Sequence, residues 1–214
     1  MKLWSYWRSS CAYRVRIALG LKGLAFEYAA VHLMRDGGQQ HRPEFHALNP
    51  HGQVPVLEVE DDGRTIPLVQ SMAIIEYLDE RYPEPPLLPR SAPARAHVRA
   101  LAELVNSGIQ PLQNTATFDE LRKHGVATEP WTRHFIARGL TSLERLAQPS
   151  AGTFLFGDEV GLADLYLVPQ LYNARRWGVT LDAFPTLIRA DENARALPAF
   201  QAAVPEVQPD AEPG

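Results

Sequence analysis

The residues best suited to chemistry form a short run near the N-terminus, where Ser9, Ser10 and Cys11 follow one another. They fall where an aromatic strand candidate, KLWSYW at 2–7, gives way to a helix candidate at 10–21. At such a junction, free backbone N–H groups and the helix dipole favour an anion by about 0.3–1 kcal/mol. Serine hydroxyls add donors that can bond a thiolate directly. The run therefore predicts an anion site, with a thiolate as one candidate anion.

Cys11 is the only cysteine of the chain, so its own role has to be weighed. If the anion were the Cys11 thiolate, its pKa would fall and the thiol would be reactive. A thioredoxin-type redox centre requires C-x-x-C, which this sequence lacks. Spacing alone leaves another interpretation open, in which Ser10 only caps the helix and Cys11 is a small half-buried filler.

Two further stretches in the same half of the chain favour binding of an extended peptide. In NPHGQVP at 49–55, Val54 precedes Pro55 at the start of a strand, and we expect that proline to be cis. The backbone groups of Val54 are then left to pair with something extended. Gln70 and Ser71 open another helix, with Ser71 as its expected cap. Together these features could hold a short peptide with its own thiol and carboxylates.

The elements that position these residues divide the chain in two. The first part alternates strand and helix candidates, and Asp62-Gly63 marks a hairpin. A βαβ unit followed by ββα predicts one mixed four-stranded sheet with helices packed against it. The strand candidates are 2–7, 26–33, 54–59 and 65–69, and the helix candidates are 10–21, 72–82, 94–106, 131–147, 162–177 and 182–197.

The predicted fold class is therefore α/β plus all-α. Five prolines at 83–93 cannot continue a helix, which predicts a linker there. We expect a thioredoxin-like domain at 1–82, and a helical domain at 94–214 that ends in a flexible tail, PEVQPDAEPG.

Composition bounds the functional class. Hydrophobic residues make up 45% and charged residues 21% of the chain, which is typical of a globular protein with a buried core. The formal net charge of −4 does not indicate the basic surface that nucleic-acid binding requires. No stretch approaches the length of a membrane span, and a single cysteine fits a reducing compartment, so we expect a cytoplasmic protein. His41, His46 and His51 lack zinc-site spacing, and no metal is expected.

The stretch SSCAYRVRIAL at 9–19 resembles the SSC-x-W/Y-RVRIAL signature of zeta-class glutathione transferases. The similarity covers nearly the whole chain and extends in particular to the maleylacetoacetate isomerases. It implies a glutathione-binding thioredoxin-like domain, a helical substrate domain, usually a homodimer, and a reacting sulfur that is glutathione's. The other matching stretches are DGGQQ (36–40), ALNPHGQVP (47–55), QSMAIIEYL (70–78), GIQPLQN (108–114), GDEVGLADLYLVPQ (157–170) and NARRW (173–177).

The resemblance also implies roles for individual residues. Ser9 and Ser10 would stabilise the glutathione thiolate, and Cys11 would tune it without being required. Arg8 and Arg176 would grip the carboxylates of the substrate. Asp164 would be structural, although Gly161 stands where the family often has Ser or Thr. The implied glutathione-binding residues are Ser9, Ser10, Cys11, Ala12, Tyr13, Arg14, Gln40, Val54, Gln70, Ser71, Gln110, Asn114, Thr115 and Ala116.

The implied reaction is cis–trans isomerisation of maleylacetoacetate, in aromatic amino-acid breakdown. A glutathione thiolate adds to the conjugated alkene, the resulting single bond rotates, and expulsion of the thiolate returns the trans isomer. Four alternatives stay open at this point: the same chemistry on maleylpyruvate, thiol oxidoreduction through Cys11, a non-catalytic binding module, and conjugation or dehalogenation of α-halo acids.

Overall fold

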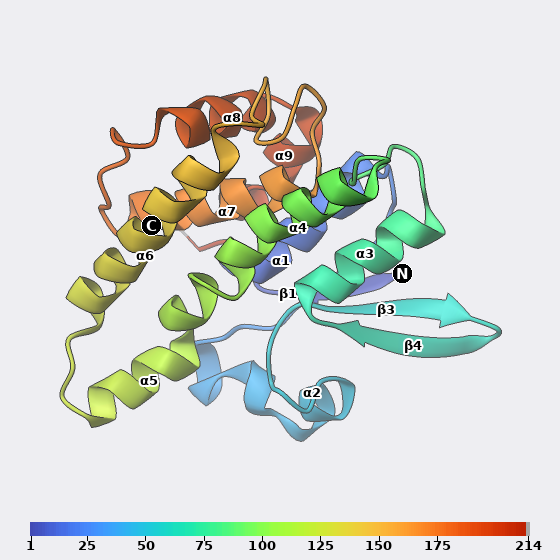
Figure 1. Cartoon of the computed structure of the whole chain (residues 1–214). Coiled ribbons are helices and arrows are strands. Elements are labelled where there is room, and N and C mark those ends of the chain that lie inside the picture. Colours follow the sequence, from blue (N-terminus) through green and yellow to red (C-terminus); the bar gives the residue numbers. More distant parts are fainter. Residues whose placement is uncertain (213–214) are drawn as a thin grey trace. The chain divides into compact units, whose positions relative to one another are not determined.

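A computed structural model describes residues 1–212, and its contacts divide the chain into two compact units (Figure 1). The first unit contains residues 1–85 together with the chain from Pro198 onward, and the second contains residues 86–197. This division differs from the predicted ranges, which place every residue from 94 onward in the helical domain.

The sheet of the first unit is mixed and four-stranded, in the order β2-β1-β3-β4. β1 pairs parallel with β2 and antiparallel with β3, and β3 pairs antiparallel with β4 across the Asp62-Gly63 turn. Both turn residues have positive φ, 47° and 73°, as a two-residue hairpin requires. The predicted sheet is thereby confirmed. Its strands are β1 (Lys2–Ser5), β2 (Glu27–Ala30), β3 (Val56–Asp61) and β4 (Arg64–Val69).

Helices cover both faces of this sheet. α1 (Ser10–Leu21) and α3 (Ser71–Arg81) contact each other on one face, and α2 (Pro43–Leu48) lies on the other (Figure 1). On the α2 face, the Trp4 ring meets Phe45 edge-on, with ring centres 6.3 Å apart. A buried cluster on this side joins the end of β1, α2 and the start of β3. Its members are Tyr6, Trp7, Val31, Phe45, Val54 and Val56.

The C-terminal segment packs on the first unit. α9 (Pro198–Ala203) contacts α1 so closely that a Cβ on Gly20 would lie 3.2 Å from the Cβ of Ala199. The buried Arg16 guanidinium donates to the carbonyl of Ala203 at 3.1 Å. These contacts are the reason why this segment belongs to the first unit.

The prediction of a flexible tail from residue 205 is wrong for the residues that the structure describes. η4 (Pro205–Val207) continues the chain, and Gln208 Nε2 donates to the carbonyls of Ala202 and Val204 at 3.0 and 2.9 Å. Hydrogen bonds extend as far as Glu212. Residues 213–214 of the predicted tail lie outside the described residues.

The second unit is helical, as predicted. Its central helix, α7, is buried almost all round and contacts both α4 and α8. The short helices η3 and α5 were not predicted, because their segment carries little apolar periodicity. The elements are α4 (Ala92–Asn106), η3 (Gln110–Gln113), α5 (Thr115–Lys123), α6 (Thr128–Ala147), α7 (Leu162–Arg176) and α8 (Pro185–Arg195).

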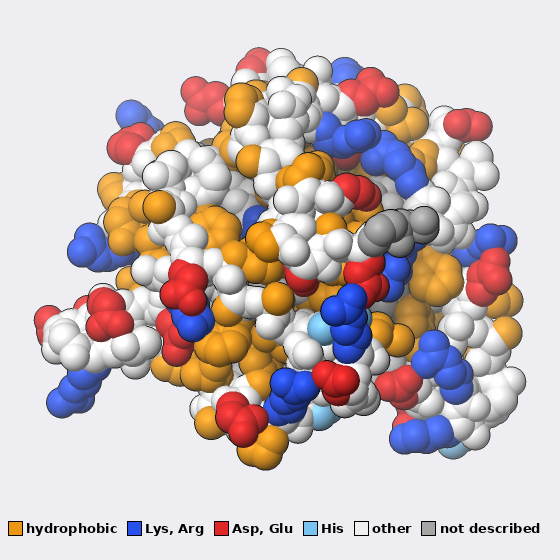
Figure 2. Space-filling view, turned by 180° about the vertical axis from the view of Figure 1, so that it is seen from behind, with side chains coloured by type: hydrophobic (Ala, Val, Ile, Leu, Met, Phe, Trp, Pro, Cys, Tyr) orange, Lys and Arg blue, Asp and Glu red, His pale blue; other side chains and the backbone are white. Residues whose placement is uncertain are grey.

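Two surface properties follow from the described residues. None of their helices combines the length and the apolar character that crossing a membrane requires. On the face in Figure 2, Lys and Arg side chains lie among Asp and Glu side chains, in agreement with a net charge of only −4.

Candidate functional site

The N-terminus of α1 carries the serine run. Ser9 is the N-cap, with extended backbone angles, and its Oγ accepts a hydrogen bond from the Ala12 N–H at 3.2 Å. The cap is therefore Ser9 and not Ser10, which is the first helical residue. Since Oγ accepts from the helix, the hydroxyl hydrogen of Ser9 is available to donate outward. No acidic side chain lies in the first turn of α1, so none competes with an incoming anion for the free N–H groups.

Ser10 and Cys11 lie on the first turn of the same helix, and all three residues of the run are half-buried. Ala12 and Tyr13 follow and are buried in the core of the first unit. The side chains of Ala12 and Tyr13 thus have a packing role. A contact of either residue with glutathione stays a prediction.

Val54 occupies the position expected for backbone pairing with an extended ligand. The Val54-Pro55 peptide bond is cis, as predicted. The ladder between β3 and β4 begins only at Val56, so the sheet makes no use of the Val54 backbone within the described residues. Its side chain is buried in the same cluster as Trp7, which lies two residues before Ser9.

The N-terminus of α3 is built differently from that of α1. Gln70 is the N-cap, with φ 69° and ψ 119°, and no side chain caps the helix. Ser71, predicted as the cap, is instead the first helical residue and is buried. The fully buried Arg14 donates from Nη1 to Ser71 Oγ at 3.3 Å. A guanidinium charge thus adjoins open N–H groups, which makes this end of α3 favourable for a carboxylate.

Gln40 lies in η2 (Gln39–His41), which follows η1 (Arg35–Gly37) in the connection from β2 to α2. Its Nε2 donates to the carbonyl of Leu33 at 3.3 Å and lies 3.1 Å from His41 Nε2. Its Oε1 is buried and has no hydrogen-bond partner among residues 1–212. An unpartnered buried acceptor is the state expected of a residue that awaits a ligand donor.

The two predicted arginines both lie at the surface. Arg8 is exposed between Trp7 and Ser9, with its guanidinium carbon 5.1 Å from the centre of the Trp7 ring. Arg176, at the end of α7, is exposed and stacks in the same way on Trp177 at 5.6 Å. Its neighbour Arg175 instead forms an ion pair with Asp191, at 2.5 Å.

The predicted residues of the helical unit cluster where η3 passes into α5. Gln110 begins η3, and Asn114 caps α5 by accepting from the Ala116 N–H at 3.3 Å. The Thr115 hydroxyl also donates to Asn114 Oδ1, at 3.2 Å. The amide oxygen of Asn114 is therefore engaged by its own helix, which leaves its Nδ2 group as the part that could reach a ligand.

Comparison with known proteins identifies the family of this chain. A model of the glutathione S-transferase N-terminal domain matches residues 3–86. The maleylacetoacetate isomerase of Pseudomonas aeruginosa is 49% identical over 98% of both chains. The holo structure of a maleyl pyruvate isomerase, a bacterial zeta-class glutathione S-transferase, is 42% identical over 99% of this chain and 100% of its own, with a TM-score of 0.93. This chain belongs to the zeta-class glutathione transferase family.

Another solved member of the family is the maleylacetoacetate isomerase of Anaeromyxobacter dehalogenans. It is 56% identical over 99% of this chain and 97% of its own, with a TM-score of 0.90. That structure holds dicarboxyethyl glutathione and citrate in its active site.

In this zeta-class chain, sequence reasoning missed a buried network of amides. Gln113 of η3 donates to Gln170 Oε1 at 2.7 Å and accepts from Asn173 Nδ2 at 2.7 Å, both on α7. These bonds fix the η3 segment, which carries Gln110, against the central helix of its own unit. The three residues lie within motifs already quoted from the sequence, but a polar residue in a motif does not reveal its partner.

Asp164 is structural, as expected. Its carboxylate accepts from the Leu155 N–H at 2.9 Å and from the Gly161 N–H at 3.0 Å, and it is 1% exposed. Burial raises the pKa of Asp164 from 3.8 to about 7, against the lowering effect of these backbone donors. Glycine is tolerated as the N-cap of α7 because the Asp164 carboxylate hydrogen-bonds the helix N-terminus in place of a cap side chain.

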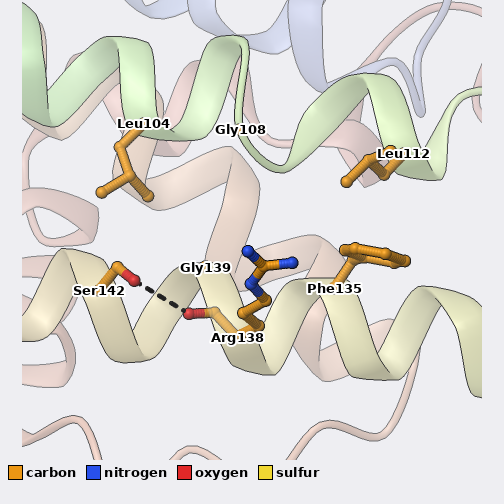
Figure 3. A pocket seen from close by; sticks show the side chains of 7 residues that line it. All are labelled: Leu104, Gly108, Leu112, Phe135, Arg138, Gly139 and Ser142. Atoms are coloured by element: carbon orange, nitrogen blue, oxygen red, sulfur yellow. Dashed lines mark hydrogen bonds between the residues drawn. The ribbon is translucent and has the colours of Figure 1, made fainter.

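A cavity of about 360 Å³ lies in the helical unit, and none of the residues that line it is a predicted site residue. In Figure 3 the Arg138 side chain rises from α6 beside the Phe135 ring, toward the chain that joins α4 to η3. Gly139 lets α6 lie close to the Ile109 side chain. A Cβ at position 139 would lie only 2.3 Å from that side chain and would clash with it. The lining residues are Leu104, Gly108, Leu112, Phe135, Arg138, Gly139 and Ser142.

Proposed function

We propose that this protein is a glutathione-dependent cis–trans isomerase that converts maleylacetoacetate to fumarylacetoacetate. The observation that carries the proposal is the N-terminus of α1. There Ser9 uses its oxygen to cap the helix and keeps its hydroxyl hydrogen for an anion. A thiolate placed there gains a direct donor and the favourable end of the helix dipole, which lowers the thiol pKa.

Glutathione is the co-substrate that these residues fit. Ser9 donates to its sulfur, with Ser10 and Cys11 beside it. Val54 pairs its backbone with the cysteinyl unit, as an added strand would. The γ-glutamyl carboxylate takes the N-terminus of α3, where Gln70 and Ser71 meet it. Further contacts assigned to glutathione are those of Ala12, Tyr13, Arg14, Gln40, Gln110, Asn114, Thr115 and Ala116.

The chemistry follows from a thiolate held in this way. The sulfur adds to an alkene carbon of the substrate, and the π electrons move through the conjugated carbonyl to make an enolate. The carbon–carbon bond is then single and rotates. Collapse of the enolate forms the trans double bond, breaks the C–S bond and returns the electron pair to sulfur, so glutathione is not consumed. Donors near the enolate oxygen stabilise the charge as it develops.

The substrate class is an unsaturated keto-dicarboxylate, with Arg8 and Arg176 as the residues that bind its carboxylates. One observation from a relative supports this class. Addition of the glutathione thiol to a butenedioate gives a dicarboxyethyl glutathione, the ligand held by the Anaeromyxobacter dehalogenans structure.

A second candidate substrate is maleylpyruvate, which undergoes the same chemistry. It is favoured by the likeness to the zeta-class maleyl pyruvate isomerase, which covers 99% of this chain. For the leading candidate, we further propose a homodimer that acts in the cytoplasm in aromatic amino-acid breakdown.

The first experiment measures loss of maleylacetoacetate and of maleylpyruvate with and without glutathione, in wild type, Ser9→Ala and Cys11→Ala. We expect isomerisation that depends on glutathione and falls about 10²–10³-fold in Ser9→Ala, as for loss of one donor to a developing anion. Cys11→Ala should lose no more than about threefold, because its thiol is a neighbour of the reacting sulfur.

The two variants separate this proposal from its alternatives. Abolition of activity in Cys11→Ala, with a mixed disulfide between Cys11 and glutathione in wild type, would indicate thiol oxidoreduction. Binding of glutathione without turnover of either substrate would contradict the isomerase proposal and favour a binding module.

A further inference from the structure

The last described residues of the chain lie against the segments that carry the proposed glutathione site. Residues 204–212, which we call the C-terminal strap, leave α9 and are pinned by the two Gln208 bonds to Ala202 and Val204. Ala211 packs on the buried cluster that contains Trp7 and Val54. Two of its carboxylates, those of Asp210 and Glu212, bind residues earlier in the first unit.

Asp210 holds the turn that leads into Ser9. Its Oδ2 accepts from the Trp7 N–H at 3.0 Å, and its Oδ1 accepts from the Tyr28 hydroxyl at 2.6 Å. Burial and this bond raise the pKa of Tyr28 well above its usual value, so the phenol remains a donor. Because Trp7 is buried, loss of Asp210 would remove the acceptor from a backbone N–H of a buried residue, which costs free energy.

The backbone carbonyls on either side of the Trp7 N–H are hydrogen-bonded as well. Arg16 Nη2 donates to the Trp7 carbonyl at 2.9 Å, and Ser9 N–H donates to the Tyr6 carbonyl at 3.0 Å. The turn from β1 to α1 is thus fixed by Arg16 from within and by Asp210 from the strap. A displacement of Trp7 would move the cap hydroxyl of Ser9 with it, since only Arg8 separates the two residues.

Glu212 holds the segment that leads to Gln40. Its Oε1 accepts from His32 Nε2 at 3.2 Å and also binds the Arg35 guanidinium. His32 Nδ1 in turn accepts from the N–H groups of Met34 and Arg35, at 3.2 and 2.8 Å. Because Nδ1 is an acceptor, the ring proton lies on Nε2 and points at Glu212. The C-terminal strap therefore contacts both the turn that leads into Ser9 and the segment that leads to Gln40, and both residues are assigned to glutathione binding.

We propose that the C-terminal strap is a positioning element for glutathione, with Asp210 as the positioning residue for Ser9 and Glu212 as a secondary one for the Gln40 segment. The inference rests on the proposed function, since it concerns the same site. Neither carboxylate is assigned a contact with substrate. Their role is to keep the donor at the sulfur in place, so it should show in glutathione affinity and in the thiol pKa.

The test compares Asp210→Ala with wild type in the full chain, by calorimetric titration with glutathione and by ultraviolet absorbance of the bound thiolate against pH. We expect the Kd for glutathione to rise about three- to tenfold, as for one lost hydrogen bond to a buried group. The pKa of the bound thiol should rise as well. Asp210→Asn, whose amide oxygen can still accept from Trp7, should return both values to within about twofold of wild type.

A matched control is Asp62→Asn, the same exchange at an exposed hairpin turn whose φ of 47° asparagine tolerates. It should leave the Kd and the thiol pKa unchanged. Should Asp210→Ala fail to fold, Asp210→Glu keeps the charge and displaces the carboxylate by one methylene, with the same rise expected. Glu212→Gln should raise the Kd about twofold, with the smaller effect of a half-exposed ion pair.

The outcomes separate the two proposals. A folded Asp210→Ala protein that melts at a lower temperature but keeps the wild-type Kd and thiol pKa would overturn the positioning role, because the strap would then be only a stabilising contact. Wild-type protein that binds glutathione and isomerises neither substrate would overturn the proposed function, while the binding comparison would still decide the role of Asp210.

Discussion

The N-termini of α3 and α7 face the same physical problem and solve it in opposite ways. In α7 a carboxylate of the chain itself, Asp164, accepts from the cap N–H of Gly161 and is buried. In α3 the cap residue Gln70 has a positive φ, no side chain caps the helix, and no acidic residue lies in the first turn. One helix end is closed from within, and the other is left open toward whatever anion arrives.

This difference separates a structural from a functional use of the helix dipole. A helix N-terminus whose N–H groups are hydrogen-bonded within the chain adds to the free energy of unfolding and has no donor left for a ligand. An N-terminus left open, with strained backbone at Gln70, gives up stability, and such strain is retained where a site requires it. Three predictions test this difference between the two helix ends, and the one with the largest expected effect comes first.

The largest effect concerns Asp164 and pH. Because burial raises its pKa from 3.8 to about 7, the folded protein binds one more proton than the unfolded chain between these values. The stabilising contribution is therefore complete below pH 3.8 and is lost as pH rises to about 7, with a slope of up to about 1.4 kcal/mol per pH unit. Urea unfolding across this range measures it.

Asp164→Asn supplies the control for that titration. It cannot ionise, so the wild type should lose unfolding free energy relative to the variant as pH rises to about 7. A difference that is independent of pH would mean that Asp164 stays ionised throughout, held so by its backbone donors.

The next effect concerns Ser71 in α3. Ser71→Ala should raise the Kd for glutathione about five- to tenfold, because a hydroxyl that meets a carboxylate is lost, and should change kcat little. Its matched control is Ser91→Ala, which removes a serine that caps α4 by accepting from the Ala94 N–H at 3.3 Å. That change should cost about 1 kcal/mol of stability and leave the Kd unaltered. Equal effects on Kd would break the comparison.

The smallest effect concerns the strained cap of α3. Gln70→Gly should raise the free energy of unfolding by about 1 kcal/mol, since glycine adopts a φ of 69° without a Cβ clash. The affinity for glutathione should fall at the same time, because the Gln70 side chain is lost. Gln70→Ala separates the two, since it removes the side chain and keeps the strain. Chemical denaturation and glutathione titration of both variants provide the measurement.

Sequence reasoning was most successful where local pattern and tertiary structure agree. The range 10–21 predicted for α1 is the range observed, because its apolar residues recur at helical spacing and Gly23 marks its C-terminal end. It was less successful where polar segments fold. α2 and α5 were missed, although Pro43 at the first turn of one and Asn114 as the cap of the other were available signals.

The site was predicted to a similar extent. The sequence indicated the serine run, the X-Pro step at Val54 and the helix start at Gln70. It did not show that Ser9 caps α1, that Gln70 and not Ser71 occupies the cap of α3, or that Arg14 lies under Ser71 at 3.3 Å. Which of two adjacent residues caps a helix depends on which of them has the first helical backbone angles, and a sequence pattern does not specify this.

The sequence by itself determined the fold class, the family and the residue types of the site, because these depend on local pattern and on motifs. Only the tertiary structure decided where residues 204–212 belong. A proline-rich polar segment is typical of a disordered tail. Here, however, Asp210 accepts hydrogen bonds from the Trp7 N–H and the Tyr28 hydroxyl, which belong to residues about two hundred positions earlier in the chain. A carboxylate becomes a structural partner only when folding buries the donors it can satisfy, and no local pattern contains that information.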